Sequence, residues 1–247
     1  MQNSQIDTCL VLEDGCQQEW MHKLAEQCQL PIREATKVQS HPNSCRFLLR
    51  LEVDGLALYA TEDHSPQPMK TNFKPWLNKA SKRDLICRAI GRQSRTIIDA
   101  TAGLGQDSAH LAAAGYEVTA VERHPGLAAL LLDAKRRSPD SLAERISIRH
   151  GDSRDLLQEL HADVVYLDPM FPQTGKSALP KRAMQVVRQM VGDDSDINEL
   201  FELAMQRFHR VVVKRPDKAA PLHSDIHHRV AGKTVAYDVY INAGIKT

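Results

Sequence analysis

Residues 95–122 read "RTIIDATAGLGQDSAHLAAAGYEVTAVE", and their pattern decides the fold of the larger part of this chain. The apolar runs at 95–100 and 117–122 predict two buried strands. Between them, residues 106–115 predict a short helix that ends at Gly115. A strand, a helix and a second strand in this order form a βαβ unit, in which the two strands run parallel.

The same alternation continues toward the C-terminus. Strands are predicted at 145–150, 163–168, 209–215 and 234–242, and helices at 124–137, 153–160, 178–191 and 196–208. We therefore predict an α/β fold with a doubly wound, mostly parallel sheet and helices on both faces. The last strand could run antiparallel, because periodicity does not distinguish the two directions.

The N-terminal part of the chain has a different pattern. Residues 1–84 predict a small β-rich α+β subdomain that ends in a basic linker, and residues 85–247 form the larger domain. Residues 9–14 predict a strand, and residues 18–30 have helical spacing that stops before Pro31. Two further strand-like runs flank Asp54-Gly55, a dipeptide typical of tight β-hairpins.

Composition narrows the class of protein without naming a partner. The chain has 247 residues, of which 42% are hydrophobic, and a net charge of +1. Its five cysteines are scattered and form no CxxC pair, which indicates reduced thiols in a cytosolic protein. There is no signal-peptide pattern, and no apolar run approaches roughly 18 residues. We therefore predict a cytoplasmic protein without membrane contact.

The linker at residues 70–83 is basic and contains two aromatic residues, Phe73 and Trp76, but no acidic residue. One interpretation is a solvated helix face with a packed aromatic side chain. The alternative is an arm that contacts RNA, since cations interleaved with aromatic rings suit phosphates and bases. The pattern alone leaves both interpretations open.

The residues that follow the predicted strands carry the functional signal, because ligands of such sheets bind beyond the carboxyl ends of the strands. Gly103 and Gly105 follow the first strand and predict either a turn that cradles a nucleotide or a simple tight turn. A dinucleotide-binding fingerprint requires a third glycine at position 108, where this chain has Ser108. This difference disfavours an NAD-binding protein.

Acidic residues stand at the next three strand ends. Glu122 can accept hydrogen bonds from both hydroxyls of a ribose, or it is a surface glutamate. Asp152 and Ser153 are placed to meet an adenine edge or to cap the following helix. Asp168 ends the fourth strand. The coincidence of these features at four successive strand ends is more specific than any one of them.

In this order the features resemble class I S-adenosylmethionine-dependent methyltransferases. The segment "DATAGLG" at residues 99–105 resembles their cofactor loop, and Glu122 resembles their ribose-binding acid. The segment "DPMFP" at residues 168–172 resembles the Asp/Asn-Pro-Pro-aromatic motif of enzymes that methylate exocyclic amino groups. Met170 stands where that motif has its second proline.

The chemistry of an exocyclic amino group explains these residue types. The nitrogen lone pair is delocalised into the ring, so the group is a poor nucleophile. Hydrogen bonds from its N–H groups to Asp168 and to a backbone carbonyl, that of Pro169, would favour a pyramidal nitrogen. Phe171 could stack on the target base. The alternative is a proline-rich turn closed by a core phenylalanine.

The segments "DATAGLGQD", "LDPMFP", "KSAL" and "VVVKRPD" together resemble the ribosomal RNA small subunit methyltransferase J family, over roughly residues 95–240. The resemblance implies a Rossmann-like fold, S-adenosyl-L-methionine as cofactor, S-adenosyl-L-homocysteine as product, and no metal. It implies methylation of the N2 amino group of guanine 1516 in 16S ribosomal RNA, in the 30S subunit or its precursor, without an obligate protein partner. The implied cofactor site comprises Asp99, Gly103, Gly105, Gln106, Asp107, Glu122, Arg123, Asp152, Ser153 and Asp168.

Two basic loops fit an RNA substrate. The first contains Lys176, Lys181 and Arg182, and the second contains Lys214 and Arg215. We expect them to contact phosphates, which would position the RNA without reading its sequence. The alternative for each loop is charge that keeps the surface soluble.

Two other functions remain open from the residues alone. The same motif would serve any planar amino group, including adenine N6 in DNA or a glutamine side chain in a protein. A nucleotide-binding module that grips RNA without catalysis would also have glycine-rich and basic loops. Binding of S-adenosylhomocysteine distinguishes the methyltransferases from this last class.

Overall fold

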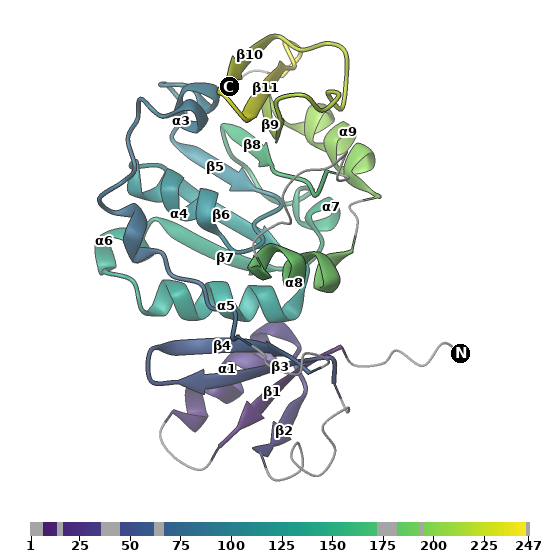
Figure 1. Cartoon of the computed structure of the whole chain (residues 1–247). Coiled ribbons are helices and arrows are strands. Elements are labelled where there is room, and N and C mark those ends of the chain that lie inside the picture. The colour runs from purple at the N-terminus through teal and green to yellow at the C-terminus, as the bar shows by residue number, and fades with distance from the viewer. Residues whose placement is uncertain are drawn as a thin grey trace.

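The computed structural model describes residues 7–13, 17–35, 45–61, 67–171, 182–192 and 195–245. These residues form two sheets, a large one that carries most of the helices and a small N-terminal one below it in Figure 1. No helix within these ranges is long and apolar enough to cross a membrane.

The large sheet confirms the predicted doubly wound architecture. Its strands, from one edge to the other, are β7 (Ile146–His150), β6 (Glu117–Glu122), β5 (Thr96–Asp99), β8 (Val164–Leu167), β9 (Arg210–Pro216), β11 (Val235–Ile241) and β10 (His228–Ala231). The first five run parallel, and β11 runs antiparallel to both of its neighbours. The open question about the last strand is thus settled, while β10 was not predicted.

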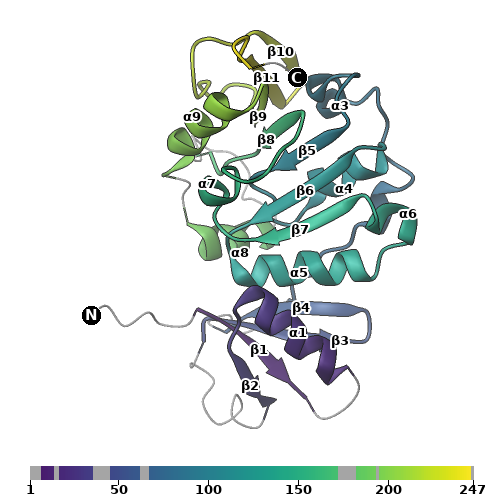
Figure 2. The same cartoon turned by 180° about the vertical axis from the view of Figure 1, so that it is seen from behind.

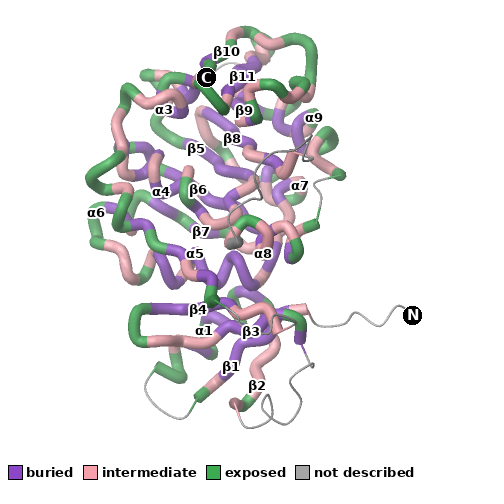
Figure 3. The backbone as a smooth tube through the Cα atoms, viewed as in Figure 1, coloured by how far each residue is buried: buried purple, intermediate pink, exposed green. Residues whose placement is uncertain are grey.

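Helices cover both faces of this sheet, because its strands are apolar on both sides. Ile97 faces the core beneath α3 (Leu85–Ile90) and α4 (Gln106–Ala113). The next residue, Ile98, faces the opposite core beneath α9 (Ile197–Arg207), next to α7 (Ser153–Leu156). Figure 3 shows the central strands buried between these layers. Further helices are α5 (Pro125–Arg136), α6 (Asp140–Ala143) and α8 (Arg182–Val191).

The small sheet has the strand order β2 (Ile32–Glu34), β1 (Thr8–Leu12), β3 (Phe47–Glu52) and β4 (Gly55–Ala60), with α1 (Gln18–Cys28) packed against it. The predicted hairpin is confirmed, but its two loop residues are Val53 and Asp54, because Glu52 pairs with Gly55. Gly55 has a φ of 126°, a conformation that glycine adopts without strain.

Helix α5 lies between the two sheets in Figures 1 and 2 and contacts strands of both. Leu49 and Leu56 of the small sheet pack with Leu127 and Leu130 of α5. The buried carboxylate of Asp133, also on α5, accepts the backbone N–H of Leu56 at 2.8 Å. The N-terminal sheet is therefore held against the large domain by both apolar and polar contacts.

The basic linker contributes its aromatic residues to the interior. Phe73 is 1% exposed and belongs to the core under α3 and α4. Trp76, in a short 3-10 helix η1 (Lys74–Trp76), stacks on His110 at 5.1 Å between ring centroids. These contacts favour the packed-aromatic interpretation over the RNA arm. They also carry the core across the predicted boundary between residues 84 and 85, which stays a prediction.

The cysteines differ from the expectation that all are reduced. Cys9 and Cys45 form a disulfide, and their Cα atoms lie 6.1 Å apart. Cys9 is in β1 and Cys45 lies just before β3, so the parallel pairing of these strands brings the two side chains together. Scattered positions in the sequence did not reveal this pairing. Cys28 and Cys87 are free and buried.

Candidate active site

A cavity of about 440 Å³ lies at the carboxyl ends of the central strands. It is situated where the strand order reverses, because β6 and β8 flank β5 on opposite sides. Its size is that of a typical small-molecule site. Predicted cofactor residues that line it are Asp99, Gly103, Gln106, Asp107, Glu122, Arg123, Asp152, Ser153 and Asp168.

A hydrogen bond between Gly103 and Glu122 links the turn after β5 to the end of β6. The N–H of Gly103 donates to Oε2 of Glu122 at 2.8 Å, and the N–H of His124 donates to Oε1 at 2.7 Å. Glu122 is 5% exposed, so it is not a surface glutamate. A carboxylate can accept about four hydrogen bonds, so both backbone contacts are compatible with ribose hydroxyls as further donors.

The two glycines of the turn serve different purposes. Gly103 has a φ of 53°, and the nearest atom to an added Cβ would be the Thr101 carbonyl oxygen at 4.0 Å, which leaves space beside the loop for a ligand. Gly105 also has a positive φ, but an added Cβ would lie 2.5 Å from Leu131 and 3.0 Å from Phe73. Gly105 does not line the cavity. We conclude that packing, and not contact with a ligand, requires glycine at this position.

Asp99 is buried at the base of the turn. Its carboxylate accepts hydrogen bonds from the hydroxyl of Ser108 and, at 3.3 Å, from the N–H of Thr101. Burial raises the pKa of Asp99 to about 7, and the nearby Asp107 carboxylate adds to this effect. Ser108, which replaces the third glycine of a dinucleotide fingerprint, is therefore a partner of the buried acid.

At the third strand end the side chains make local contacts. Asp152 caps α7 by accepting the N–H of Arg154 at 2.9 Å, and it pairs with the Arg154 guanidinium at 2.7 Å. This hydrogen bonding lowers the pKa of Asp152. The hydroxyl of Ser153 donates to the Ala100 carbonyl at 2.6 Å. The helix-cap interpretation is confirmed, and contact with an adenine edge stays a prediction.

The Asp-Pro motif follows β8 and borders the cavity. The N–H of Asp168 donates to the hydroxyl oxygen of Thr101 at 2.6 Å, which ties the ends of β8 and β5 together. The N–H of Phe171 donates to the Pro169 carbonyl at 2.9 Å, and Arg188 of α8 donates to the Phe171 carbonyl at 3.0 Å. Two of these contacts, with Thr101 and Arg188, therefore join the motif backbone to other elements, and the third lies within the motif.

The two side chains at the tip of the motif pack in opposite directions. Met170 packs against the core that α5 shares with the small sheet, whereas Phe171 packs against the core beneath α9. Both residues also line the cavity. Met170 therefore makes apolar contacts with this core at the position where the Asp/Asn-Pro-Pro-aromatic motif has its second proline.

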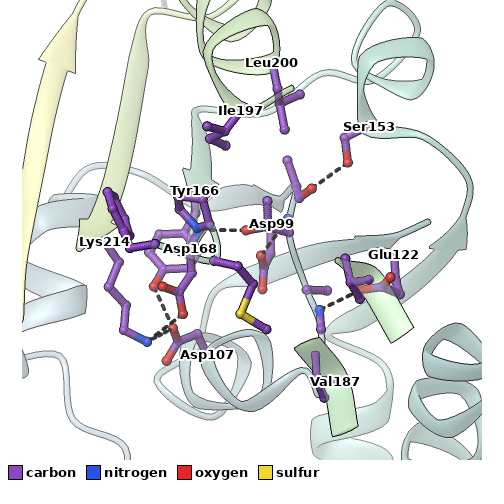
Figure 4. A pocket seen from close by; sticks show the side chains of 18 of the residues that line it. Asp99, Asp107, Glu122, Ser153, Tyr166, Asp168, Val187, Ile197, Leu200 and Lys214 are labelled. Carbon is purple, nitrogen blue, oxygen red and sulfur yellow. Dashed lines mark hydrogen bonds and ion pairs between the residues drawn. The ribbon is translucent and has the colours of Figure 1, made fainter. Parts of the chain in front are cut away.

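The predicted RNA-binding residues are distributed differently from the expectation. Arg215 is 4% exposed and pairs with Asp238, so its guanidinium is not available to a phosphate; this corrects the prediction for Arg215. Lys214 forms ion pairs with Asp107 and Asp168 inside the cavity (Figure 4). Arg182 begins α8, whereas Lys176 and Lys181 lie outside the described residues.

Several residues of the site were missed from sequence. They are Thr101, Arg154, Tyr166, Arg188 and Asp196, which all line the cavity. Asp196 accepts a hydrogen bond from Arg123 at 2.7 Å. Tyr166 could have been inferred, because it precedes Asp168 by two positions and residues two apart in a strand share a face.

The reversed strand order, the open turn at Gly103, the buried acid at the end of β6 and the Asp-Pro motif define a class I S-adenosylmethionine-dependent methyltransferase. The family described as "Putative SAM-dependent methyltransferase" matches residues 31–242. The chain belongs to the ribosomal RNA small subunit methyltransferase J family, as the similarity to curated relatives shows.

Two such relatives illustrate the match. The ribosomal RNA small subunit methyltransferase J of Dechloromonas aromatica is 36% identical, with 88% of this chain and 96% of the relative covered. That of Pseudomonas aeruginosa is 36% identical, with 93% and 92% covered. The crystal structure of the SAM-dependent methyltransferase NGO1261 from Neisseria gonorrhoeae is 27% identical, covers 97% of both chains and has a TM-score of 0.72.

Proposed function

We propose that this protein transfers a methyl group from S-adenosylmethionine to the N2 amino group of guanine 1516 in 16S ribosomal RNA. The observation that carries the proposal is the position of Asp168 and Pro169. They border the same cavity as Glu122 and Gly103, the expected ribose and cofactor contacts. The names of the relatives supply the class of substrate, a small-subunit ribosomal RNA.

The residues of the cavity fit S-adenosylmethionine. Glu122 would accept hydrogen bonds from its ribose hydroxyls, and the backbone beside Gly103 would approach it closely. Asp152 and Ser153 would lie near its adenine, with Ile197 and Leu200 as apolar neighbours across the cavity. When bound, this cofactor supplies a methyl group attached to a positively charged sulfur.

Asp168 and Pro169 would orient the target nitrogen. The Asp168 carboxylate and the Pro169 carbonyl would accept its two N–H groups, and the ring of Phe171 would face the guanine. The nitrogen lone pair would form the new bond to the methyl carbon, the electron pair of the broken C–S bond would stay on sulfur, and the nitrogen would lose one proton to water. No covalent enzyme intermediate is needed.

The basic residues Lys176, Lys181 and Arg182 follow the Asp-Pro motif along the chain, and we propose that they contact RNA phosphates. The proposed substrate is the 30S subunit or its precursor, which would place the protein in the cytoplasm. Neither an obligate protein partner nor a metal is part of the proposal.

The test is methyl transfer to 30S particles, naked 16S RNA, DNA and total protein, with the labelled base mapped. The proposal expects label on the N2 atom of guanine 1516 and a higher rate with 30S particles than with naked RNA. Label confined to DNA or protein would refute the substrate. RNA binding without methyl transfer and without measurable binding of S-adenosylhomocysteine would support the non-catalytic RNA-binding module instead.

A further inference from the structure

Lys214 is a cation in the wall of the active-site cavity, although sequence reasoning predicted it on an RNA-binding loop. It extends from β9, which pairs with β8 in parallel, so that Val213 lies opposite Leu167. This register places Lys214 beside Asp168. The Lys214 side chain is 25% exposed, a low value for a lysine that would contact phosphates from the surface.

The Lys214 ammonium bridges two carboxylates. Its Nζ atom lies 2.7 Å from Oδ2 of Asp107 and 2.9 Å from Oδ2 of Asp168. The hydroxyl of Tyr166 donates to the same oxygen of Asp107 at 2.6 Å. Figure 4 shows these groups converging from β8, β9 and the start of α4. Lys214 therefore connects the Asp-Pro motif to Asp107 at the start of α4 and, through Asp107, to Tyr166.

The charges around Lys214 explain why it stays protonated. Burial alone would lower its pKa, but the carboxylates of Asp168 and Asp107 outweigh burial and raise the pKa well above its usual range. Asp99 is a third carboxyl group near both acids, as the effect of Asp107 and Asp168 on its pKa shows. Without an ammonium, these neighbouring carboxylates would repel each other in the cavity wall.

We propose that Lys214 is a positioning residue that acts through Asp168, and that it does not bind RNA. Its hydrogen bond would hold the Asp168 carboxylate in the direction that accepts an N–H of the target amino group, and its charge would balance the acids around it. The proposal rests on the proposed function, since it assigns Lys214 a role in orienting the same amino group.

The contacts distinguish this role from phosphate binding. A lysine that binds phosphate must give up its contacts with Asp107 and Asp168 to the RNA, which would remove the positive charge that balances both carboxylates. A positioning lysine keeps both partners while substrate binds. Its loss should therefore slow methyl transfer at saturating substrate and leave RNA affinity nearly unchanged.

The experiment compares the full chain with three variants: Lys214→Met, Lys214→Arg and Lys214→Gln. Lys23→Met is the matched control, because Lys23 lies on the distant surface of α1 in an exposed pair with Glu19. Measurements are the single-turnover rate on 30S particles, the Kd for 30S particles as a function of salt, and the Kd for S-adenosylhomocysteine by calorimetry.

For Lys214→Met we expect a rate reduced by about 10²-fold, because small misplacements of reacting groups cost this much. Both Kd values should stay within about 3-fold, and the slope of log K against log salt should not change, since no phosphate contact is lost. Lys214→Arg, which keeps the charge, should recover most of the rate. Lys214→Gln, which keeps a donor without the charge, should recover less.

An unchanged rate in Lys214→Met would overturn the proposal. A weaker 30S complex would also overturn the proposal if the slope of log K against log salt became shallower by about one. That change would mean that Lys214 contacts a phosphate. If Lys214→Met does not fold, equal rates for the Arg and Gln variants would overturn it. Failure of the proposed function is seen separately, as a wild-type protein that does not methylate guanine N2.

Discussion

The backbone N–H of Asp168 donates a hydrogen bond of 2.6 Å to the hydroxyl oxygen of Thr101. This contact joins the turn after β5 to the motif after β8, the two strand ends where the order of the sheet reverses. It links the loop expected to hold the cofactor to the residue expected to hold the target nitrogen. The predictions below concern the groups on either side of this link.

Thr101→Val should disturb the motif. The substitution keeps the shape of the side chain but leaves the Asp168 N–H without its acceptor, which costs about 1–3 kcal/mol if no water replaces it. We expect a lower Tm and slower methyl transfer. Thr101→Ser keeps the hydroxyl and serves as the control in thermal unfolding and single-turnover assays. Equal Tm values for the two variants would contradict the assigned role.

Asp168→Ala should separate cofactor binding from chemistry. We expect methyl transfer to fall by about 10²-fold or more, because a group that orients the transition state is lost. The Kd for S-adenosylhomocysteine should change only several-fold, since the contacts at Glu122 and Gly103 remain. Calorimetry measures the affinity for S-adenosylhomocysteine, and a methylation assay measures the rate of methyl transfer. A variant that methylates RNA at a near-normal rate would refute the mechanism.

Glu122→Gln should lower both the stability of the turn at Gly103 and the affinity for the cofactor. Both Glu122 oxygens accept backbone N–H groups, so the glutamine NH₂ would face the N–H of Gly103 or His124. Two opposed donors cost about 1–3 kcal/mol. Calorimetry should show at least about 10-fold weaker binding of S-adenosylhomocysteine. Glu117→Gln, on the exposed end of the same strand, weakens only a surface ion pair with Arg145 and should change Tm little and affinity not at all.

Gly103→Ala and Gly105→Ala should have different effects. Both positions have positive φ, which costs roughly 1 kcal/mol for alanine. At Gly105 the new Cβ would also collide with Leu131 and Phe73, so we expect the larger loss of stability there. At Gly103 the methyl group would meet open space, and the larger loss should be in cofactor affinity. Chemical denaturation measures the stability of both variants, and calorimetry measures their affinity for S-adenosylhomocysteine. A larger loss of stability in Gly103→Ala than in Gly105→Ala would contradict this prediction.

Asp99 should make stability depend on pH in an unusual direction. Its pKa is about 7 in the folded protein and near its ordinary value of 3.8 when unfolded, so between these values the folded state binds more protons. Its contribution therefore favours folding at low pH and is lost as pH rises toward 7. Relative to wild type, Asp99→Asn should gain roughly 2–4 kcal/mol of stability on going from pH 4 to pH 8. Denaturant unfolding at several pH values would show a constant difference if Asp99 did not titrate this way.

Much of the fold could be predicted, because apolar periodicity reports which faces of a segment are buried. The runs that became β5, β6 and β8 are apolar on both faces, which only a sheet covered on both sides explains. The short strands β2 and β10 were missed. Each is at the edge of its sheet and has a partly exposed pattern, so its sequence has no strong period.

The cavity-lining residues that follow parallel strands could be predicted from the sequence. The roles of residues that depend on tertiary packing could not. Gly103, Glu122 and Asp168 follow parallel strands, and the carboxyl ends of such strands meet at one edge. The roles of Gly105 and Arg215 depend on neighbours that are distant in the chain, Leu131 for the glycine and Asp238 for the arginine. Local composition has no information about these neighbours.

The sequence by itself determined the order of strands and helices, the residues at each strand end and, through its motifs, the class of reaction. Only the tertiary structure decided which charges pair. Lys214 is 107 positions from Asp107 and 46 from Asp168, yet both contacts are shorter than 3 Å. The sequence does not distinguish a lysine on a surface loop from a lysine in a cavity wall. Their environments differ because the register of β9 against β8, set by packing of the whole sheet, directs one lysine inward.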